Sequence, residues 1–211
     1  MKPKVSIIDY GLCNLYNVSN SFQHIGANVK IISTPEEIKK SDRIILPGVG
    51  AFKNGMRGLN LRNLIEPLKE HVQKKLPFLG ICLGMQIMFD ISYEFGEIEG
   101  LGVIPGKVIK IPSLGTNKIK HKIPHIGWNK LEFVNNSMNN SILNGQDQST
   151  VYFVHSYMAI CKNDENLLAK TIYNGIDIAS VVYKENSFGC QFHPERSGEH
   201  GLNILKEFLN L

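Results

Sequence analysis

The sequence lacks any apolar run near the roughly 20 residues that a membrane-spanning helix needs. The N-terminal strand-like stretch from Val5 to Ile8 ends at Asp9 and is too short for a signal-peptide core. No internal repeat and no linker rich in Pro, Gly or Ser divides the chain. We therefore expect a cytoplasmic protein without membrane association, in which residues 1–211 form one domain.

A strong charge of one sign is also missing. Lys and Arg number 23 against 19 Asp and Glu, which gives a formal net charge of +4. This excess is too small to indicate binding to nucleic acid. One basic cluster, Lys-Ile-Lys-His-Lys at 118–122, has no interleaved aromatic residues on which bases could stack. It is either a solvated loop or a surface for a partner or an anionic ligand.

Cysteine is scarce, and its spacing is not that of a metal site. The four cysteines are Cys13, Cys82, Cys161 and Cys190, and no C-x-x-C pair occurs. A zinc site or a thioredoxin-like motif is therefore not expected, and neither a metal nor another cofactor is predicted. Without an export signal, the thiols are expected to stay reduced.

The first half of the sequence alternates apolar strands with helical patterns. Strands are predicted at 5–8, 29–32, 44–46 and 78–81, and helices at 15–25, 61–75 and 85–95, with a helix start at 34–37. After residue 100, strand-like segments are predicted at 103–104, 108–111, 131–134, 151–154, 167–172 and 178–183. A loop is predicted at 135–141, between the third and fourth of these segments, and a helix at 202–209 ends the chain. This order predicts an α/β fold, with a mixed, largely parallel sheet flanked by helices.

The most informative segment is Gly-Ile-Cys-Leu-Gly at 80–84, between a predicted strand and a predicted helix. G-x-C-x-G is the cysteine version of a nucleophile elbow, in which small neighbours make room for a sharp turn. A helix N-terminus behind Cys82 favours a thiolate, and the N–H of Leu83 is placed to bind a developing oxyanion. The alternative is a buried structural cysteine, but packing does not explain two glycines at this spacing.

A thiolate nucleophile needs a base and a group that orients the base. His193-Pro194-Glu195 supplies both, because a residue before proline favours extended backbone and side chains two residues apart then share a face. Glu195 can reach one imidazole nitrogen of His193 while the other nitrogen faces Cys82, as in a catalytic triad. Alone, the His-Pro-Glu sequence would more often be structural.

A third segment, Pro-Gly-Val-Gly at 47–50, follows the strand at 44–46. Glycines at Gly48 and Gly50 leave backbone amides, including that of Val49, open to close approach by a substrate carbonyl. A simple tight turn is the alternative. Ligands of parallel sheets bind at the carboxyl ends of strands, where this segment and the 80–84 turn both lie.

Residues 79–86 and 191–195 resemble the two signatures of class I, triad-type glutamine amidotransferases. Four further segments, at 9–11, 47–52, 124–129 and 152–157, resemble the glutaminase subunits of imidazole glycerol phosphate synthases. The resemblance runs from Val5 to the C-terminal helix and implies the flavodoxin-like fold of that family. One position departs from the family pattern: Cys13 stands where a glycine is expected. A cysteine held there at positive φ would cost about 1 kcal/mol or more.

The resemblance implies an enzyme that hydrolyses L-glutamine to glutamate and ammonia, with Gln86 and His155-Ser156-Tyr157 lining the glutamine pocket. It also implies a heterodimer with a cyclase of the (β/α)₈ type. By the same resemblance, ammonia is expected to cross the interface, and the cyclase to form imidazole glycerol phosphate and an aminoimidazole ribonucleotide in histidine biosynthesis. The basic 107–130 region is a candidate for this interface.

Two other hypotheses remain open at this point. The same glutaminase could supply ammonia to a sugar-amidating synthase of cell-surface glycan biosynthesis. Residues 120–125 also resemble the glutaminase paralogues of those pathways. The chain could instead be a non-catalytic binding module on this fold. Such a module would be expected to have a damaged triad, whereas Cys82, His193 and Glu195 are all present.

Overall fold

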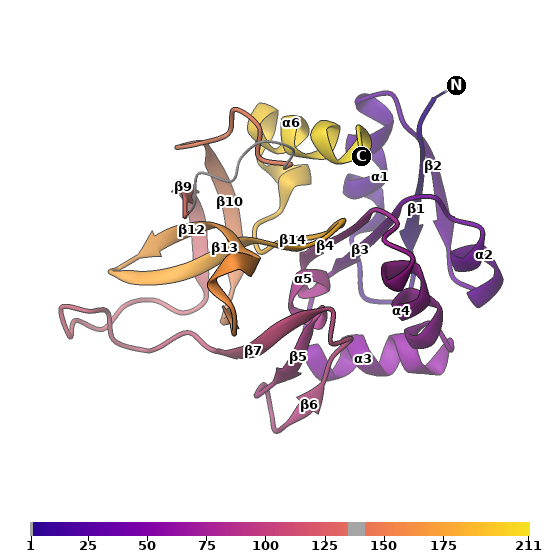
Figure 1. The fold of residues 1–211 in the computed structure, drawn as a ribbon. Helices are drawn as coiled ribbons and strands as arrows, with labels where there is room; N and C mark the ends of the chain where they lie inside the picture. Colours follow the sequence, from indigo (N-terminus) through magenta and orange to yellow (C-terminus); the bar gives the residue numbers. More distant parts are fainter. Residues whose placement is uncertain (1, 135–141) are drawn as a thin grey trace.

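The computed structural model describes residues 2–134 and 142–211. Its centre is an eight-stranded sheet, shown in Figure 1 with helices on both faces. In spatial order the strands are β2 (Asn28–Ile32), β1 (Lys4–Ile8), β3 (Ile44–Gly48), β4 (Phe78–Cys82), β14 (Ser187–Cys190), β13 (Ile176–Lys184), β12 (Leu167–Tyr173) and β9 (Glu132–Phe133). Pairing is parallel from β2 to β14 and antiparallel from β14 to β9. The predicted mixed sheet is confirmed.

Two smaller sheets flank the end of the main sheet. One pairs β8 (His125–Lys130) with β10 (Thr150–His155), and the other contains β11 (Tyr157–Cys161), β7 (Ile104–Lys110), β5 (Phe89–Ser92) and β6 (Ile98–Glu99) in that order. β10 runs almost directly into β11, with Ser156 between them. This turn places residues 154–157 beside the carboxyl ends of β3 and β4, where the cavity described below lies.

The helices cover the two faces of the main sheet. They are α1 (Leu15–His24), α2 (Pro35–Lys39), α3 (Phe52–Leu61), α4 (Ile65–Gln73), α5 (Leu83–Ile87) and α6 (Gly198–Leu209), with short 3₁₀ turns η1 (Asp164–Asn166) and η2 (Pro194–Arg196). Figure 1 shows α1 and α6 together on one face and α3 on the other. None of the helices in the described residues is long and apolar enough to cross a membrane.

Strand side chains alternate between two hydrophobic cores, as the period of a strand requires. In β3, Ile45 joins the core under α1 and α6, whereas Ile44 and Leu46 join the core under the other helices. In β4, Leu79 and Phe78 divide in the same way. The central strands are thus buried on both faces, which explains their continuous apolar sequence.

The helix predicted at 61–75 is confirmed over α4, whereas the helix predicted at 85–95 was wrong over most of its length. A separate helix, α3, precedes α4 and was not predicted; Asn63, at φ 56°, lies between the two. The pattern at 85–95 belongs to a helix only as far as Ile87, where α5 ends, and β5 follows. Residues 83–89 are all buried, so helical spacing did not distinguish helix from strand there.

Other local predictions are confirmed. The helix at 34–37 begins with a side-chain cap, since Thr34 Oγ1 accepts a hydrogen bond from the N–H of Glu37. The C-terminal helix is α6. The loop predicted at 135–141 lies outside the described residues.

Candidate active site

Cys82 lies at the sharp turn between β4 and α5 that the sequence predicted. Its backbone has φ 54° and ψ −108°, a strained conformation for a residue with a side chain. A Cβ on Gly80 would lie 2.7 Å from the Met85 nitrogen, and one on Gly84 would collide with the Leu46 carbonyl oxygen. Both glycines are therefore required by the close approach of backbone segments around the cysteine.

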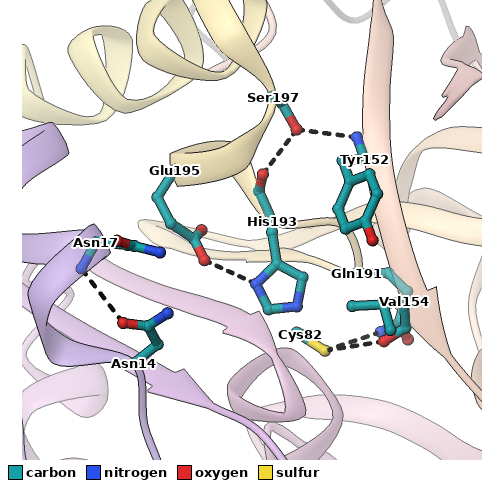
Figure 2. Close-up of polar contacts among 9 residues, drawn as sticks. All are labelled: Asn14, Asn17, Cys82, Tyr152, Val154, Gln191, His193, Glu195 and Ser197. Atoms are coloured by element: carbon teal, nitrogen blue, oxygen red, sulfur yellow. Dashed lines mark hydrogen bonds and ion pairs between the residues drawn. The ribbon is translucent and has the colours of Figure 1, made fainter. Parts of the chain in front are cut away.

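His193 and Glu195 come to Cys82 because β14 pairs with β4. The two strands are parallel with Cys190 opposite Ile81, so the chain leaves β14 beside the elbow. His193 Nδ1 lies 2.7 Å from Glu195 Oε1, and both side chains are almost fully buried. Figure 2 shows the other ring nitrogen, Nε2, directed toward Cys82. The structure thus brings the three sequence-predicted residues into one site.

The electrostatics of His193 follow from these neighbours. Burial by itself lowers its pKa, but the contacts with Cys82 and with the Glu195 carboxylate more than offset this and raise the pKa to about 10. His193 Nε2 is buried and has no hydrogen-bond partner in the described residues. This nitrogen can therefore take the proton of the Cys82 thiol and hold it as part of an imidazolium.

Ser197 fixes the backbone of His193. Its hydroxyl donates to the His193 carbonyl oxygen at 2.7 Å and accepts from the N–H of Tyr152, on β10, at 3.0 Å (Figure 2). The His193 N–H donates to the Tyr152 carbonyl at 2.9 Å. The sequence analysis missed Ser197, because its role depends on β10 lying beside η2.

A cavity of about 360 Å³ opens in front of the cysteine. It is lined by Val49, Gly50, Cys82, Leu83, Gln86, Glu94, Pro124, Val154, His155, Ser156, Tyr157 and His193. Every pocket residue predicted from the sequence lines this cavity except Gly48. Gly48 is needed for packing, because a Cβ there would collide with the Tyr10 hydroxyl.

Glu94 is a cavity residue that the sequence analysis missed. Its side chain is buried, and Oε2 accepts a hydrogen bond from the N–H of Phe52 at 2.6 Å. This contact joins the end of β5 to the start of α3. Glu94 was not considered as a site residue because the sequence analysis assigned residues 85–95 to a helix.

The 47–50 turn does not present all its amides to the cavity. The N–H of Val49 donates to the Leu12 carbonyl oxygen at 2.8 Å, so this donor is already engaged. Gly50 has φ +103°, a conformation that favours glycine. The turn is therefore held to the 10–13 loop on one side and borders the cavity on the other.

The other three cysteines are not placed for nucleophilic chemistry. Cys13 does not have a positive φ, so the cysteine at this position, where the family has a glycine, causes no backbone strain. Its thiol donates to the Ile8 carbonyl oxygen, with sulfur and oxygen 3.6 Å apart. Burial raises the pKa of Cys13 and Cys190, and raises that of Cys161 to about 12. These thiols stay protonated near neutral pH.

The comparisons with known proteins agree with this geometry. The model of the family "Glutamine amidotransferase class-I" matches residues 6–211. The chain is 51% identical to imidazole glycerol phosphate synthase subunit HisH 1 of Legionella pneumophila (strain Lens), over 98% of this chain and 99% of that protein. It is 47% identical to subunit HisH of Lactococcus lactis, over 98% of each chain.

Solved structures with lower sequence identity share the fold. PurLQS from Thermotoga maritima superposes with a TM-score of 0.74 at 19% identity, over 100% of this chain and 99% of that one. The glutaminase domain of Trypanosoma brucei CTPS has a TM-score of 0.64 at 15% identity, over 98% and 94%. The chain therefore belongs to the class I glutamine amidotransferases, among the HisH glutaminase subunits of imidazole glycerol phosphate synthase.

Proposed function

We propose that Cys82, His193 and Glu195 are the catalytic triad with which this chain hydrolyses L-glutamine. His193 Nε2 takes the thiol proton, and the sulfur attacks the carboxamide carbon to form a tetrahedral intermediate. His193 then protonates the departing ammonia, which leaves a γ-glutamyl thioester on Cys82. Finally His193 activates a water that cleaves the thioester and releases glutamate.

One observation carries this proposal. A cysteine at a strained elbow faces a histidine whose far nitrogen is 2.7 Å from a buried carboxylate. This contact makes Nδ1 the protonated nitrogen of neutral His193, so Nε2 is free to act as the base. A structural cysteine would require neither the strain nor the oriented imidazole.

The cavity offers complementary groups to glutamine. Glu94 contributes a buried carboxylate, which suits the α-ammonium group of the substrate. Gln86, His155, Ser156 and Tyr157 line the same space and are proposed to position the carboxamide and the α-carboxylate. The volume of about 360 Å³ is in the range of small-ligand sites.

The oxyanion is proposed to bind the N–H of Leu83 and an amide of the 48–50 turn. The Val49 N–H is engaged with Leu12 at 2.8 Å, so it must turn away from that carbonyl before it can contribute. One such donor contributes about 3 to 4 kcal/mol to an oxyanion intermediate. Partner binding that breaks the Val49–Leu12 hydrogen bond would therefore activate the enzyme.

The partner is proposed to be a (β/α)₈ cyclase that docks on β8 and receives the ammonia. Ile126 and Trp128 on β8 are each more than half exposed, although both are large and apolar. The Trp128 ring packs edge-on against Tyr152, with centroids 5.7 Å apart, and Arg196 lies over the Tyr152 ring at 4.6 Å. Exposed aromatic and arginine side chains of this kind are enriched at protein interfaces. Arg196 follows Glu195 directly, so this face borders the triad.

We further propose that the chain acts in the cytoplasm as one glutaminase domain. Four free cysteines suit a reducing compartment. The relatives support histidine biosynthesis as the pathway, because those compared are named imidazole glycerol phosphate synthase subunits.

The test combines activity with partner identification. In the purified complex, Cys82→Ala should abolish glutamate release from glutamine, yet the synthase should still use added ammonium salts. Glutamate release at the wild-type rate by Cys82→Ala would contradict the proposed nucleophile. Co-purification from the native host should recover a cyclase of histidine biosynthesis; recovery of a sugar-amidating synthase would replace that pathway with glycan biosynthesis.

A further inference from the structure

The side chain of Gln191 ends at the Cys82 sulfur. Gln191 is fully buried just beyond β14, and its Nε2 lies 3.9 Å from Cys82 Sγ (Figure 2). Its Oε1 accepts a hydrogen bond from Gln86 Nε2 at 3.0 Å. We propose that Gln191 is a positioning residue, whose amide N–H holds the Cys82 sulfur as a thiolate after His193 has taken its proton. This inference rests on the role of Cys82 proposed above.

The direction of the Gln191 amide is fixed by a backbone carbonyl. The Tyr157 carbonyl oxygen can only accept, so the Gln86 atom 3.0 Å from it must be the donor Nε2. That same nitrogen also faces Gln191, and it can only donate, so Gln191 must present Oε1 to it. The N–H₂ end of Gln191 is then left to face the sulfur.

A second donor holds the carbonyl on which this direction depends. His155 Nδ1 lies 2.8 Å from the Tyr157 oxygen. Burial lowers the pKa of His155 to about 3, so the ring is neutral and its proton is on Nδ1. His155 Nε2 then accepts from His125 Nδ1 at 3.0 Å. A continuous set of hydrogen bonds therefore runs from His125, on β8, through Tyr157 and Gln86 to Gln191.

Two polar groups near the Cys82 sulfur favour opposite protonation states of the thiol. The Val154 carbonyl oxygen lies 4.0 Å away and suits a thiol, whose S–H can donate to it. After proton transfer that oxygen faces an anion, and the N–H of Gln191 becomes the favourable contact. The helix behind Cys82 is only five residues long, so its dipole is small. In the described residues, Gln191 is the one neutral side chain that donates to this sulfur.

The titratable groups around the sulfur come from four parts of the chain. They are His193 and Glu195 beyond β14, His155 on β10, Glu94 beyond β5 and Tyr10 beyond β1. Only His193 exchanges a proton with the sulfur in the proposed reaction. Gln191→Met adds or removes no titratable group, so its effect on thiolate reactivity can be measured separately; Gln191→Glu adds a carboxylate beside the sulfur.

The experiment measures alkylation of Cys82 by iodoacetamide in the full-length chain, from about pH 5 to about pH 9. Peptide mass spectrometry follows each cysteine, and the fully buried Cys190 reports any unfolding by becoming reactive. Gln191→Met removes both polar atoms, whereas Gln191→Glu keeps an acceptor for Gln86 and places an oxygen against the sulfur. The matched control is Gln146→Met, since Gln146 is a buried glutamine outside the cavity that bonds Ser149.

We expect both Gln191 variants to alkylate Cys82 about tenfold more slowly near neutral pH, with the pH midpoint moved up by about one unit. The control should match the wild type. If both variants keep Cys190 protected and alkylate Cys82 at the wild-type rate and midpoint, Gln191 has only a packing role. If wild-type Cys82 reacts no faster than Cys13, and His193→Ala makes no difference, the proposed nucleophile itself is wrong.

Discussion

Glu195→Gln isolates the charge that orients the catalytic histidine. Glu195 Oε1 lies 2.7 Å from His193 Nδ1, and the two side chains are 2% and 6% exposed. Glutamine has nearly the same size and still offers an oxygen to the Nδ1–H. The substitution therefore removes a buried negative charge with little change in packing.

The size of the effect follows from the pKa of His193. Burial lowers this pKa, yet Cys82 and Glu195 bring it from 6.5 to about 10. One pKa unit corresponds to about 1.4 kcal/mol, so the two partners stabilise the imidazolium by about 5 kcal/mol beyond the cost of burial. If Glu195 supplies half of this, its loss costs about 2 to 3 kcal/mol in each step that forms the imidazolium, or about 100-fold in rate.

The assay is glutamate release by the complex with its synthase partner, measured as kcat/KM for wild type and Glu195→Gln. We expect a loss of about 100-fold or more, because the imidazolium forms in the rate-determining part of the reaction. A variant that retains activity within about threefold of wild type would refute this reasoning, since less than 1 kcal/mol would then depend on the charge.

The same pKa predicts how stability depends on pH. The folded pKa of His193, about 10, lies above its reference value of 6.5, so folding favours the charged ring. This contribution is complete below about pH 6.5 and is lost as the pH rises through about 10. Urea unfolding should show a larger loss of unfolding free energy over this range for wild type than for Glu195→Gln. Parallel curves would contradict the assigned shift.

Three further predictions concern Cys82 and the 47–50 turn. A glutamine-like electrophile should label Cys82 and spare Cys13, since only Cys82 has a candidate base beside it; peptide mapping that found the label mainly on Cys13 would contradict this. The free chain should be a poor glutaminase, and a synthase partner with its ligand bound should raise the rate about 100-fold or more, because release of the Val49 N–H supplies an oxyanion donor. Gly50→Val should restrict the rotation of this turn and so reduce the stimulated rate; because φ +103° is unfavourable for a β-branched residue, a lower melting temperature is expected as well. A free chain as fast as the liganded complex would exclude this form of activation.

The sequence contains enough to predict the elbow, because its constraint is local. Gly80 and Gly84 lie within two residues of Cys82, and the strand before them is continuously apolar. The orienting contact between His193 and Glu195 is likewise local. By contrast, the approach of His193 to Cys82 depends on parallel pairing of β14 with β4, whose residues are more than 100 positions apart. The sequence analysis expected that contact because a thiolate nucleophile needs a base, and the family resemblance supported it; no local pattern shows the strand pairing itself.

Other parts of the site were missed for physical reasons that can be named. α3 contains Gly55 and Gly58, which weaken a helical pattern but fit close packing against Ile87 and Tyr10. The apolar residues after Cys82 recur at helical spacing although residues 83–89 are all buried, so β5 and with it Glu94 were assigned to a helix. Gln191 acts through contacts made by three separate segments, and such contacts have no sequence period.

The most direct test of the account is to detect the covalent intermediate. Acid quenching of the complex during turnover of glutamine, followed by peptide mass spectrometry, should find one γ-glutamyl group on the peptide that contains Cys82. The adduct should be absent in Cys82→Ala, together with glutamate release. A γ-glutamyl group on another residue, or undiminished glutamate release by Cys82→Ala, would contradict the assignment of Cys82 as the nucleophile.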